Sequence, residues 1–543
     1  MDLKKKLSTI KIPKEIVNIA KNLIIDISGV TFAGSRTKSA SLIYNLAEET
    51  YLEGNCEIIG MKKKLNPAGA AFVNGALGHS LDFDDNCYAG VVHGSSVVFP
   101  AVLACAQQNK LSGAELLKSF IIGLEIQFAV AKAFSNDIYH KGWWTTSVFG
   151  SVGSTAGTAS LLGLKTNKIK NALSISLSGV GAVRAIRGTN AKHYYCGKSA
   201  ENGILSSNIA KKGATGPNDV FEDRNGILKI LNDNEFNYDL IKNIGDDFSL
   251  LDPGVDIKKY PVCYASHAAA DGINSILKSK KIKIREISQV ICTVPPIIAS
   301  NLTYNNPTTV KEAQFSMQFS IAMIIKFGSI KLNFLDDQYI LDEDTKKLME
   351  IIDMRVGELP NNIKKSEIIC PEWSNVKLVD KSGNCYEKFM GAPIGSAKKP
   401  LDQAMLFNKF KSCIEFSGIS QSPDYLYNKL INKKSIEQLF LKGNNFTEFP
   451  IQTHWRKLNN DNYNIKVAIS VPKKRFPKAV NRNLIKRYIK ESFRTNSMRL
   501  KNHLSNQKNK IHILFIFIDN KEYDFKTINN KISVILERLI KLT

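Results

Sequence analysis

Apolar and small residues recur at helical spacing from residue 7 to residue 250, in segments separated by short polar loops. Ser112 precedes one such segment, 113–134, whose apolar side chains are spread around a helix, and serine is a favoured N-cap residue. Gly, Ala and Ser dominate residues 68–78 and 150–163, which allows helices to approach one another closely. The pattern predicts a tightly packed all-α domain.

The pattern changes near residue 255. Residues 287–294 are rich in Ile and Val and predict a strand, while the turn residues 381–384 predict a hairpin between 375–378 and 386–390. Residues 266–278 and 332–352 keep helical spacing. We therefore expect an inserted α+β lid domain at 255–392, within a helical domain that comprises 1–254 and 393–425.

A second change of composition occurs near residues 425–432 and marks a third domain, 428–543. Its pattern predicts the order α-β-β-α-β-α, with room for one more short strand. The expected elements are a helix at 434–441, strands at 449–455 and 465–470, a helix at 479–494, a strand at 511–518 and a closing helix at 527–542. The chain is thus expected to be a multi-domain protein that ends in a small α/β domain.

The composition narrows the class of protein. No apolar stretch approaches the ~18–20 residues that cross a bilayer, and charged residues interrupt the apolar pattern at 10–27, as in an amphipathic helix. Nine cysteines occur without any CxxC spacing, which argues against a disulfide framework and a zinc site. We expect a cytoplasmic protein with no membrane segment and no bound metal.

The net charge of +24 is unevenly distributed. Residues 431–543 hold 24 Lys and Arg against 8 Asp and Glu, so two thirds of the excess lies in about a fifth of the chain. Such an asymmetry points to a polyanionic partner for the C-terminal domain.

An acid/base cluster is indicated by the segment 82–93. Asp82, Asp84 and Asp85 are followed by His93, so three carboxylates and an imidazole fall within a dozen residues at a predicted helix end. The same residues would also suit an acidic loop on a solvated surface, and the spacing alone does not decide between the two interpretations.

Cationic segments elsewhere favour a site for carboxylates. The loop 184–193 carries Arg184, Arg187 and Lys192, and Lys258 lies shortly before Cys263 and His267. Arginine binds carboxylates bidentately and lysine binds them as a point charge. Proton abstraction next to a carboxylate needs such cations, because they stabilise the developing enolate.

Five segments in order resemble the MmgE/PrpD family, which includes 2-methylcitrate dehydratase, cis-aconitate decarboxylase and iminodisuccinate epimerase. They are NGALGHSLDFDDNCYAGVVHGSS, GWWTTSVFGSVGSTAGTASLLGL, AKHYYCGKSAENGILSSNIAKKGATGP, KKYPVCYASHAAADG and EAQFSMQFSIA. The resemblance runs from about residue 17 to about residue 422. It implies a helical domain with a lid, a homodimer through the helical domain, and a cofactor-free site between domains that acts on a small di- or tricarboxylate.

Carried over position by position, the resemblance assigns catalytic roles to Asp82, Asp84, His93, Lys192 and Lys258. Substrate contacts are expected from Asn86, Trp144, Arg187, Cys263, His267 and Phe319. Three positions depart from the family pattern, since Asn86, Trp144 and Phe319 replace a threonine, a histidine and a tyrosine. The loss of an imidazole and a phenol favours racemisation, isomerisation or another elimination over decarboxylation.

A basic helix dominates the C-terminal domain. In 473–494 only Glu491 is acidic, and Arg482, Lys486, Lys490 and Arg494 follow one i, i+4 row, with Asn483 and Arg487 beside them. Leu484, Ile485, Tyr488 and Ile489 occupy the opposite side. One face can therefore meet phosphates while the other is buried against a sheet. Lys473, Lys474 and Arg475 extend the basic segment.

This domain resembles the bacterial ribonuclease P protein component, whose motif R-N-x-x-K-R-x-x-[RK]-E falls on residues 482–491 without a gap. The resemblance implies a fold like domain 2 of ribosomal protein S5. The implied partners are the RNase P RNA subunit, which cleaves with Mg²⁺, and the 5′ leader of precursor tRNA. Phe446, Phe449 and Trp455 are candidates for stacking on single-stranded bases and would equally suit the core of the domain. Two functional hypotheses remain: a bifunctional fusion, or a chain in which only the ribonuclease P module is active.

Overall fold

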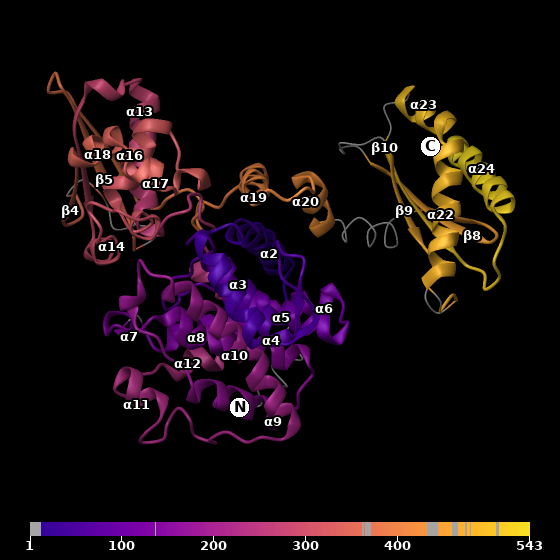
Figure 1. Ribbon diagram of the computed structural model, residues 1–543, viewed down its shortest axis with the longest axis horizontal. Helices are drawn as coiled ribbons and strands as arrows, with labels where there is room; N and C mark the ends of the chain where they lie inside the picture. Colours follow the sequence, from indigo (N-terminus) through magenta and orange to yellow (C-terminus); the bar gives the residue numbers. More distant parts are fainter. Residues whose placement is uncertain are drawn as a thin grey trace. The chain divides into compact units, whose positions relative to one another are not determined.

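The chain folds into two compact units, Met1–Pro423 and Asp424–Thr543, which we call the large unit and the small unit. The computed structural model describes residues 12–135, 137–360, 363, 371–431, 444–458, 465–472, 475–477, 479–506 and 510–542. Figure 1 shows the elements of each unit. The predicted helix at 434–441 and the basic residues Lys473 and Lys474 lie outside the described residues.

Helices make up most of the first half of the large unit. Their bounds are α2 Lys14–Gly34, α3 Lys38–Thr50, α4 Pro67–His79, α5 Ser95–Asn109, α6 Gly113–Ala133, α7 Asp137–His140, α8 Thr145–Leu161, α9 Thr166–Ser178, α10 Ala191–Lys212, α11 Ile227–Asn232 and α12 Tyr238–Lys242. The cap at Ser112 is confirmed, because its Oγ accepts from Glu115 N–H and the Glu115 side chain accepts from Ser112 N–H.

Small residues bring α4, α8 and α10 close together. A Cβ at Gly203 in α10 would lie 2.6 Å from the carbonyl carbon of Ser154 in α8, and a Cβ at Gly75 in α4 would lie 3.1 Å from Cα of Gly197. These distances leave no room for a side chain at either crossing. The predicted close approach of helices is therefore present.

The prediction of an all-α domain is wrong in one detail. Strand β1, Glu53–Glu57, pairs with β2, Lys64–Leu65, in a short antiparallel hairpin. Only one residue of each strand is buried, Cys56 and Leu65. An alternation of buried and exposed residues in such short strands is too weak to be recognised in the sequence.

Helix α2 is long and apolar enough to cross a membrane by length and composition, the one such helix among the described residues. It packs against α4 and α19, Gln403–Ser417. Most of its apolar window is buried, and Asp26 within it forms an ion pair with Lys409 at 2.7 Å. In the large unit it is a core helix.

The second half of the large unit contains a four-stranded sheet with the strand order β4-β3-β5-β6. The strands are β3 Ile287–Val294, β4 Ile352–Val356, β5 Ser374–Asp380 and β6 Cys385–Met390. Strand β3 runs parallel to β4 and antiparallel to β5. Helices α13, His267–Lys280, and α16, Met317–Phe327, share its apolar core. The strand at 287–294 and the hairpin around 381–384 are confirmed.

The helix predicted at 332–352 is broken into shorter pieces, α17 Asp337–Ile340 and α18 Glu343–Glu350, and is followed by β4. Asp336 and Asp342 each act as an N-cap, accepting from Gln338 N–H and Thr345 N–H. A side chain that caps a new helix competes with continuation of the previous one, so the single helix does not form.

The small unit has a second four-stranded sheet, with the order β7-β8-β10-β9. Its elements are β7 Asn444–Glu448, β8 Ile451–Leu458, β9 Ile465–Ser470, α22 Ala479–Asn496, α23 Met498–Asn506, β10 Lys510–Phe517 and α24 Phe525–Leu542. Alternate residues of β10 are buried in the core, and α22 and α24 pack against each other and share that core with the sheet (Figure 1).

Two predictions for the small unit need correction. The expected strand at 449–455 begins at Ile451, because Phe449 and Pro450 form the turn that joins β7 to β8. Strand β7 fills the place left for one more short strand. Helix α23 was not expected, since its apolar residues Leu500 and Leu504 are few, although both are fully buried.

Candidate functional sites

The turn after α4 positions the first predicted catalytic residue. Asp82 lies in this turn with a left-handed backbone, φ 50°. Side chains from distant segments donate to four consecutive carbonyl groups: Lys311 to Ser80, Gln314 to Leu81, Lys258 to Asp82 and Lys409 to Phe83. Carbonyl groups at a helix C-terminus lack partners within the helix and attract cations. The turn is therefore held by the part of the large unit that follows residue 257.

Asp82 is bound between two lysines. Its Oδ1 lies 2.5 Å from Nζ of Lys192, and its Oδ2 lies 3.0 Å from Nζ of Lys258. Burial alone would raise the pKa of Asp82, but the two ammonium groups outweigh burial and hold that pKa well below its usual range. Asp82 is thus an ionised orienting group for both lysines rather than a free base.

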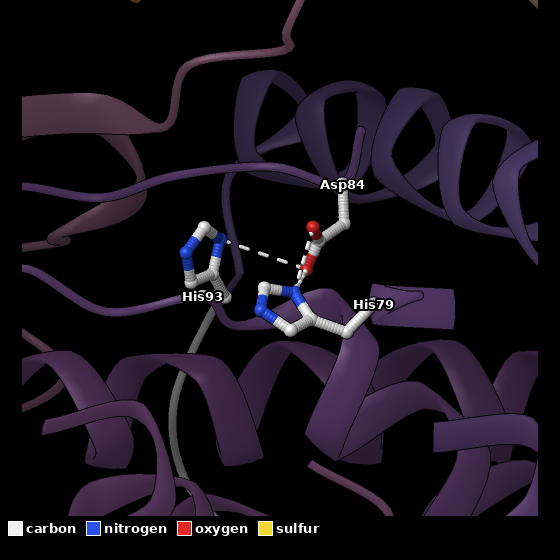
Figure 2. A group of neighbouring side chains, drawn as sticks. All are labelled: His79, Asp84 and His93. Carbon is white, nitrogen blue, oxygen red and sulfur yellow. Dashed lines mark hydrogen bonds and ion pairs between the residues drawn. The ribbon is translucent and has the colours of Figure 1, made fainter. Parts of the chain in front are cut away.

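A second cluster lies beside the first and contains His79, Asp84 and His93 (Figure 2). His79 Nδ1 lies 2.9 Å from both carboxylate oxygens of Asp84, and His93 Nδ1 lies 3.6 Å from Asp84 Oδ2. The two imidazole rings are 4.5 Å apart between centroids. His79 was not predicted, although it precedes the acidic segment by only three residues.

His93 has a defined tautomer. Its Nδ1 lies 2.7 Å from the carbonyl oxygen of Asp85, which can only accept, so Nδ1 carries the hydrogen and Nε2 keeps its lone pair. Burial lowers the pKa of His93 to about 3, which keeps the ring neutral. His93 is therefore a base whose orientation is fixed by a backbone group.

Two imidazoles and a carboxylate are also a donor set for divalent metals, and the ligand atoms of His79, Asp84 and His93 all lie within 4.8 Å of one another. Hydrogen bonds already occupy Nδ1 of both histidines. His79 Nε2 has no hydrogen-bond partner among the described residues, so a metal can use this nitrogen without displacing the bond at Nδ1. The three residues thus form a hydrogen-bonded acid/base cluster that also carries a metal-type donor set.

Most of the predicted site residues line one cavity in the large unit. They are Asp82, Asn86, His93, Trp144, Arg187, Lys192, Lys258 and Cys263. Asp84 lies behind this wall, where it holds His79. The cavity joins segments from 82–93, 139–192 and 258–372, so both halves of the large unit contribute to it.

Two of the residues predicted to contact substrate do not line the cavity. His267 is fully buried at the start of α13, between the rings of Tyr260 and Tyr264. Phe319 is fully buried in the first turn of α16, in the core beneath the sheet. Neither side chain lines the cavity in this structure, and contact of either with substrate stays a prediction.

A polar network on the cavity wall was not predicted. Asn301 Oδ1 accepts from the Tyr139 hydroxyl at 2.6 Å and from Arg184 and Arg187 at 3.3 Å, and Asn301 Nδ2 lies 3.4 Å from Glu372. All five residues line the cavity. Nε of Arg184 and Nε of Arg187 are buried and have no hydrogen-bond acceptor among the described residues, so the hydrogen bonds of neither guanidinium are fully satisfied by the protein.

The small unit presents the predicted basic face. Lys486, Arg487 and Lys490 in α22 are exposed, whereas Ile485 and Ile489 on the opposite side are buried. Asn483 and Arg475 are exposed too. Arg482 is partly buried and donates to the carbonyl groups of Phe476 and Pro477. Arg494 is exposed but forms an ion pair with Glu491.

The predicted stacking aromatics divide into two groups. Phe446 is only 9% exposed and Trp455 only 6%, and both belong to the core of the small unit. Arg538 covers the Phe446 ring at 4.5 Å. These two rings are therefore core residues rather than stacking platforms. Phe449, in the turn between β7 and β8, is 54% exposed.

Known families match both parts of the chain. The model of the MmgE/PrpD N-terminal domain matches residues 4–239, and that of the MmgE/PrpD C-terminal domain matches 260–422. The Ribonuclease P model matches residues 427–540. The chain is thus a fusion of an enzyme-family region with an RNA-processing domain. It belongs to the MmgE/PrpD family over most of its length and carries a Ribonuclease P domain after it, as the sequence predicts.

Individual relatives match each part. Human cis-aconitate decarboxylase is 27% identical over 416 residues, which cover 73% of this chain and 83% of that protein. Cis-aconitate decarboxylase of Aspergillus terreus is 24% identical over 427 residues, 75% of this chain and 86% of that protein. The ribonuclease P protein component of Porphyromonas gingivalis is 29% identical over 125 residues, 22% of this chain and 86% of that protein.

The buried position of Asp82 generates a stability prediction. Asp82→Asn leaves Lys192 and Lys258 without a carboxylate partner, and removal of one member of a buried ion pair costs about 3–5 kcal/mol. The pKa of Asp82 is depressed in the folded chain. The difference in the free energy of unfolding between the unmodified chain and Asp82→Asn is therefore present at neutral pH and shrinks as the pH falls below about 4. Urea unfolding of the large unit, followed at several pH values, measures it.

Asp337→Asn is the matched control, because Asp337 pairs with Lys38 on the surface, where both side chains are at least half exposed. Screening by solvent makes such a pair contribute little, so no measurable change is expected. Equal effects of the two substitutions would contradict the role given to Asp82.

Proposed function

We propose that the large unit is a cofactor-free lyase or isomerase that removes a proton next to a carboxylate of a small di- or tricarboxylate. The observation that carries the proposal is the cavity in which a neutral, oriented His93 lies beside the pair of lysines fixed by Asp82. The Arg184 and Arg187 side chains on the same cavity wall supply a second region for carboxylate binding.

The chemistry follows from the charges. A substrate carboxylate binds the cations, His93 Nε2 takes the α-proton, and Lys192 and Lys258 stabilise the negative charge that moves onto the enolate oxygens. A bound polyanion also favours the protonated imidazole, which raises the basicity of His93 from its low value in the empty cavity. Asp82 keeps both ammonium groups in place throughout.

The relatives named cis-aconitate decarboxylase make cis-aconitate the first substrate to test. In this chain Asn86 and Trp144 stand in the cavity where the family pattern has a threonine and a histidine. Trp144 offers an apolar ring instead of an imidazole, and Lys192 Nζ lies 5.9 Å from its centroid. We therefore propose isomerisation, epimerisation or a different elimination as the outcome, with decarboxylation as the reference reaction.

Turnover of a panel of acids tests the proposal. The full chain is incubated with citrate, methylcitrate, cis-aconitate and iminodisuccinate, and products are followed by nuclear magnetic resonance. Lys192→Ala is expected to lower kcat/KM by about 10²–10³-fold, the usual effect of removing one donor to a developing oxyanion. Lys198→Ala, on the same helix but paired with Glu201, is expected to have no effect. Absence of turnover by the unmodified chain would leave only the ribonuclease P module as functional.

For the small unit we propose the role of a ribonuclease P protein subunit that binds the catalytic RNA and the precursor tRNA leader. The exposed cations of α22 support it, because Lys486, Arg487 and Lys490 form a basic row opposite a buried apolar face, without an ion pair among the described residues. In this role the RNA, with its Mg²⁺, performs cleavage, and the protein contributes phosphate contacts. Phe449 is the exposed ring that can stack on a leader base.

RNA binding is expected to depend on two exposed lysines. Lys486→Ala combined with Lys490→Ala removes about two phosphate contacts, so the slope of log K against log salt is expected to become shallower by about 2. Filter binding of RNase P RNA at several salt concentrations measures this slope. Carboxylate turnover by the double variant is expected to stay unchanged, and Lys192→Ala is expected to leave RNA binding unchanged. A loss of RNA binding in Lys192→Ala would contradict separate sites.

We further propose that the large unit forms a homodimer through α10. Its outer face carries Tyr195, Leu205 and Ile209, which are 36%, 50% and 48% exposed, on a helix whose other face is closely packed. An exposed apolar stripe of this kind is typical of an interface between copies.

The substitution Leu205→Glu places a charge in that stripe and is expected to convert the dimer to a monomer in sedimentation velocity. Met405→Glu, at an exposed apolar position of α19, is the control and is expected to leave the dimer intact. A monomeric unmodified chain at micromolar concentration would refute the dimer.

A further inference from the structure

The cavity of the large unit contains a clear base but few groups that can give up a proton. The Nδ1 hydrogen of His93 is committed to the Asp85 carbonyl, so its free Nε2 can accept a proton but has none to donate. Asp82 is an ionised carboxylate between two lysines. Asp82 and Asp84 raise the pKa of Lys258 despite its burial, which makes this ammonium a poor acid.

The hydroxyl and thiol groups of the cavity are also poor acids. The Tyr139 hydroxyl donates to Asn301, and burial raises the pKa of Tyr139 to about 12. Burial also raises the pKa of the Cys263 thiol to about 12. The hydroxyl of Tyr88 donates to Glu372 Oε2 at 2.6 Å. A reaction that ends with protonation of carbon or of a leaving group needs a stronger acid than these.

Among the described residues, Glu372 is the one carboxyl group besides Asp82 that lines the cavity. It lies just before β5, is only 5% exposed, and its carboxyl group contacts the Tyr88 hydroxyl and, at 3.4 Å, Asn301 Nδ2. Among the described residues, none of the lysine or arginine side chains forms an ion pair with it, in contrast to Asp82 with its two. A buried carboxylate without a cationic partner is costly, which favours the protonated carboxyl group.

The surroundings of Glu372 support the neutral form. Burial is the largest influence and raises the pKa of Glu372. Asp82 acts in the same direction, while Tyr88, Asn301 and Lys258 oppose it without outweighing burial. Asp256 also faces Glu372, and its own pKa is raised to about 7 by burial.

We propose that Glu372 is the proton donor of the reaction carried out in this cavity. The inference rests on the proposed function of the large unit and adds to it the acid that complements His93. Glu372 lines the same cavity as His93 and both lysines, so a small polycarboxylate held there can touch base and acid together.

The step balances without any further reactant. After His93 has accepted the α-proton, the O–H bond of Glu372 breaks and a new bond forms, either C–H at the enolate carbon or O–H on a departing hydroxide. The resulting Glu372 carboxylate is stabilised by hydrogen bonds from Tyr88 and Asn301. Water then returns a proton to Glu372, and the His93 proton leaves to solvent, so no electrons are exchanged with an external group.

Glu372→Gln in the full chain tests the proposal, since it keeps the shape and removes the acidic proton. Net turnover of the acid that the unmodified chain converts is expected to fall by about 10²–10⁴-fold, the range for loss of a general acid. Exchange of the substrate α-hydrogen with deuterium oxide is expected to persist within a few fold, because His93 is intact. Affinity for the same acid, measured by calorimetry, is expected to change little.

The pH profile separates an acid from a structural residue. The donor must be protonated, so kcat of the unmodified chain falls as the pH rises through the pKa of Glu372, and this alkaline limb is expected to be absent from the residual activity of Glu372→Gln. Glu125→Gln is the matched control. Glu125 is another buried glutamate whose pKa is raised by burial, to about 7, but it accepts from Ser249 and Leu250 N–H and does not line the cavity. This variant is expected to keep full turnover and the alkaline limb.

The outcomes separate failure of the donor role of Glu372 from failure of the function proposed for the large unit. Unchanged kcat in Glu372→Gln, or equal loss of exchange and turnover, overturns the role of Glu372 and leaves the proposed function standing. If the unmodified chain converts none of the acids and exchanges no α-hydrogen, the proposed function fails and the donor role fails with it. A selective loss of turnover with the altered pH profile supports both.

Discussion

The large unit depends on the capture of one helix end by side chains from far along the chain. Four successive carbonyl groups at residues 80–83 accept from Lys311, Gln314, Lys258 and Lys409. These groups lie at the negative end of α4, where carbonyls lack intrahelical partners. The same contacts tie the helical half to the half that contains the sheet, so the site exists only when both halves are folded.

Lys258 both holds the turn at residues 80–83 and takes part in the proposed chemistry. Its Nζ donates to the Asp82 carbonyl oxygen at 2.8 Å and contacts Asp82 Oδ2 at 3.0 Å. One fully buried ammonium group therefore fixes both the backbone and the side chain of Asp82. Because Asp82 also holds Lys192, the position of both lysines follows from a single turn. A cluster built in this way is preorganised for an anion before the anion binds.

Local sequence signals predicted much of this organisation. The N-cap at Ser112, strand β3 and the amphipathic helix α22 each depend on residues close together in the chain, and all were recognisable. The wall formed by Tyr139, Arg184, Asn301 and Glu372 was largely missed. These residues come from four separate segments and contact one another only after folding, so no spacing in the sequence links them. For Phe446 and Trp455 the sequence left two interpretations open, since an aromatic side chain suits both a core strand and an exposed platform.

The two parts of the chain hold their cations in opposite environments. In the large unit the cations are buried and partly compensated by Asp82, so attraction is strong at short range and weakly screened. In α22 the cations are exposed, and the attraction extends over about a Debye length and depends on salt. A buried cluster selects a small anion by shape and hydrogen bonds, whereas an exposed row binds a long phosphate backbone with little selectivity of its own. The buried cluster and the exposed row suit different classes of anion, which supports the proposal of two functions for the fusion.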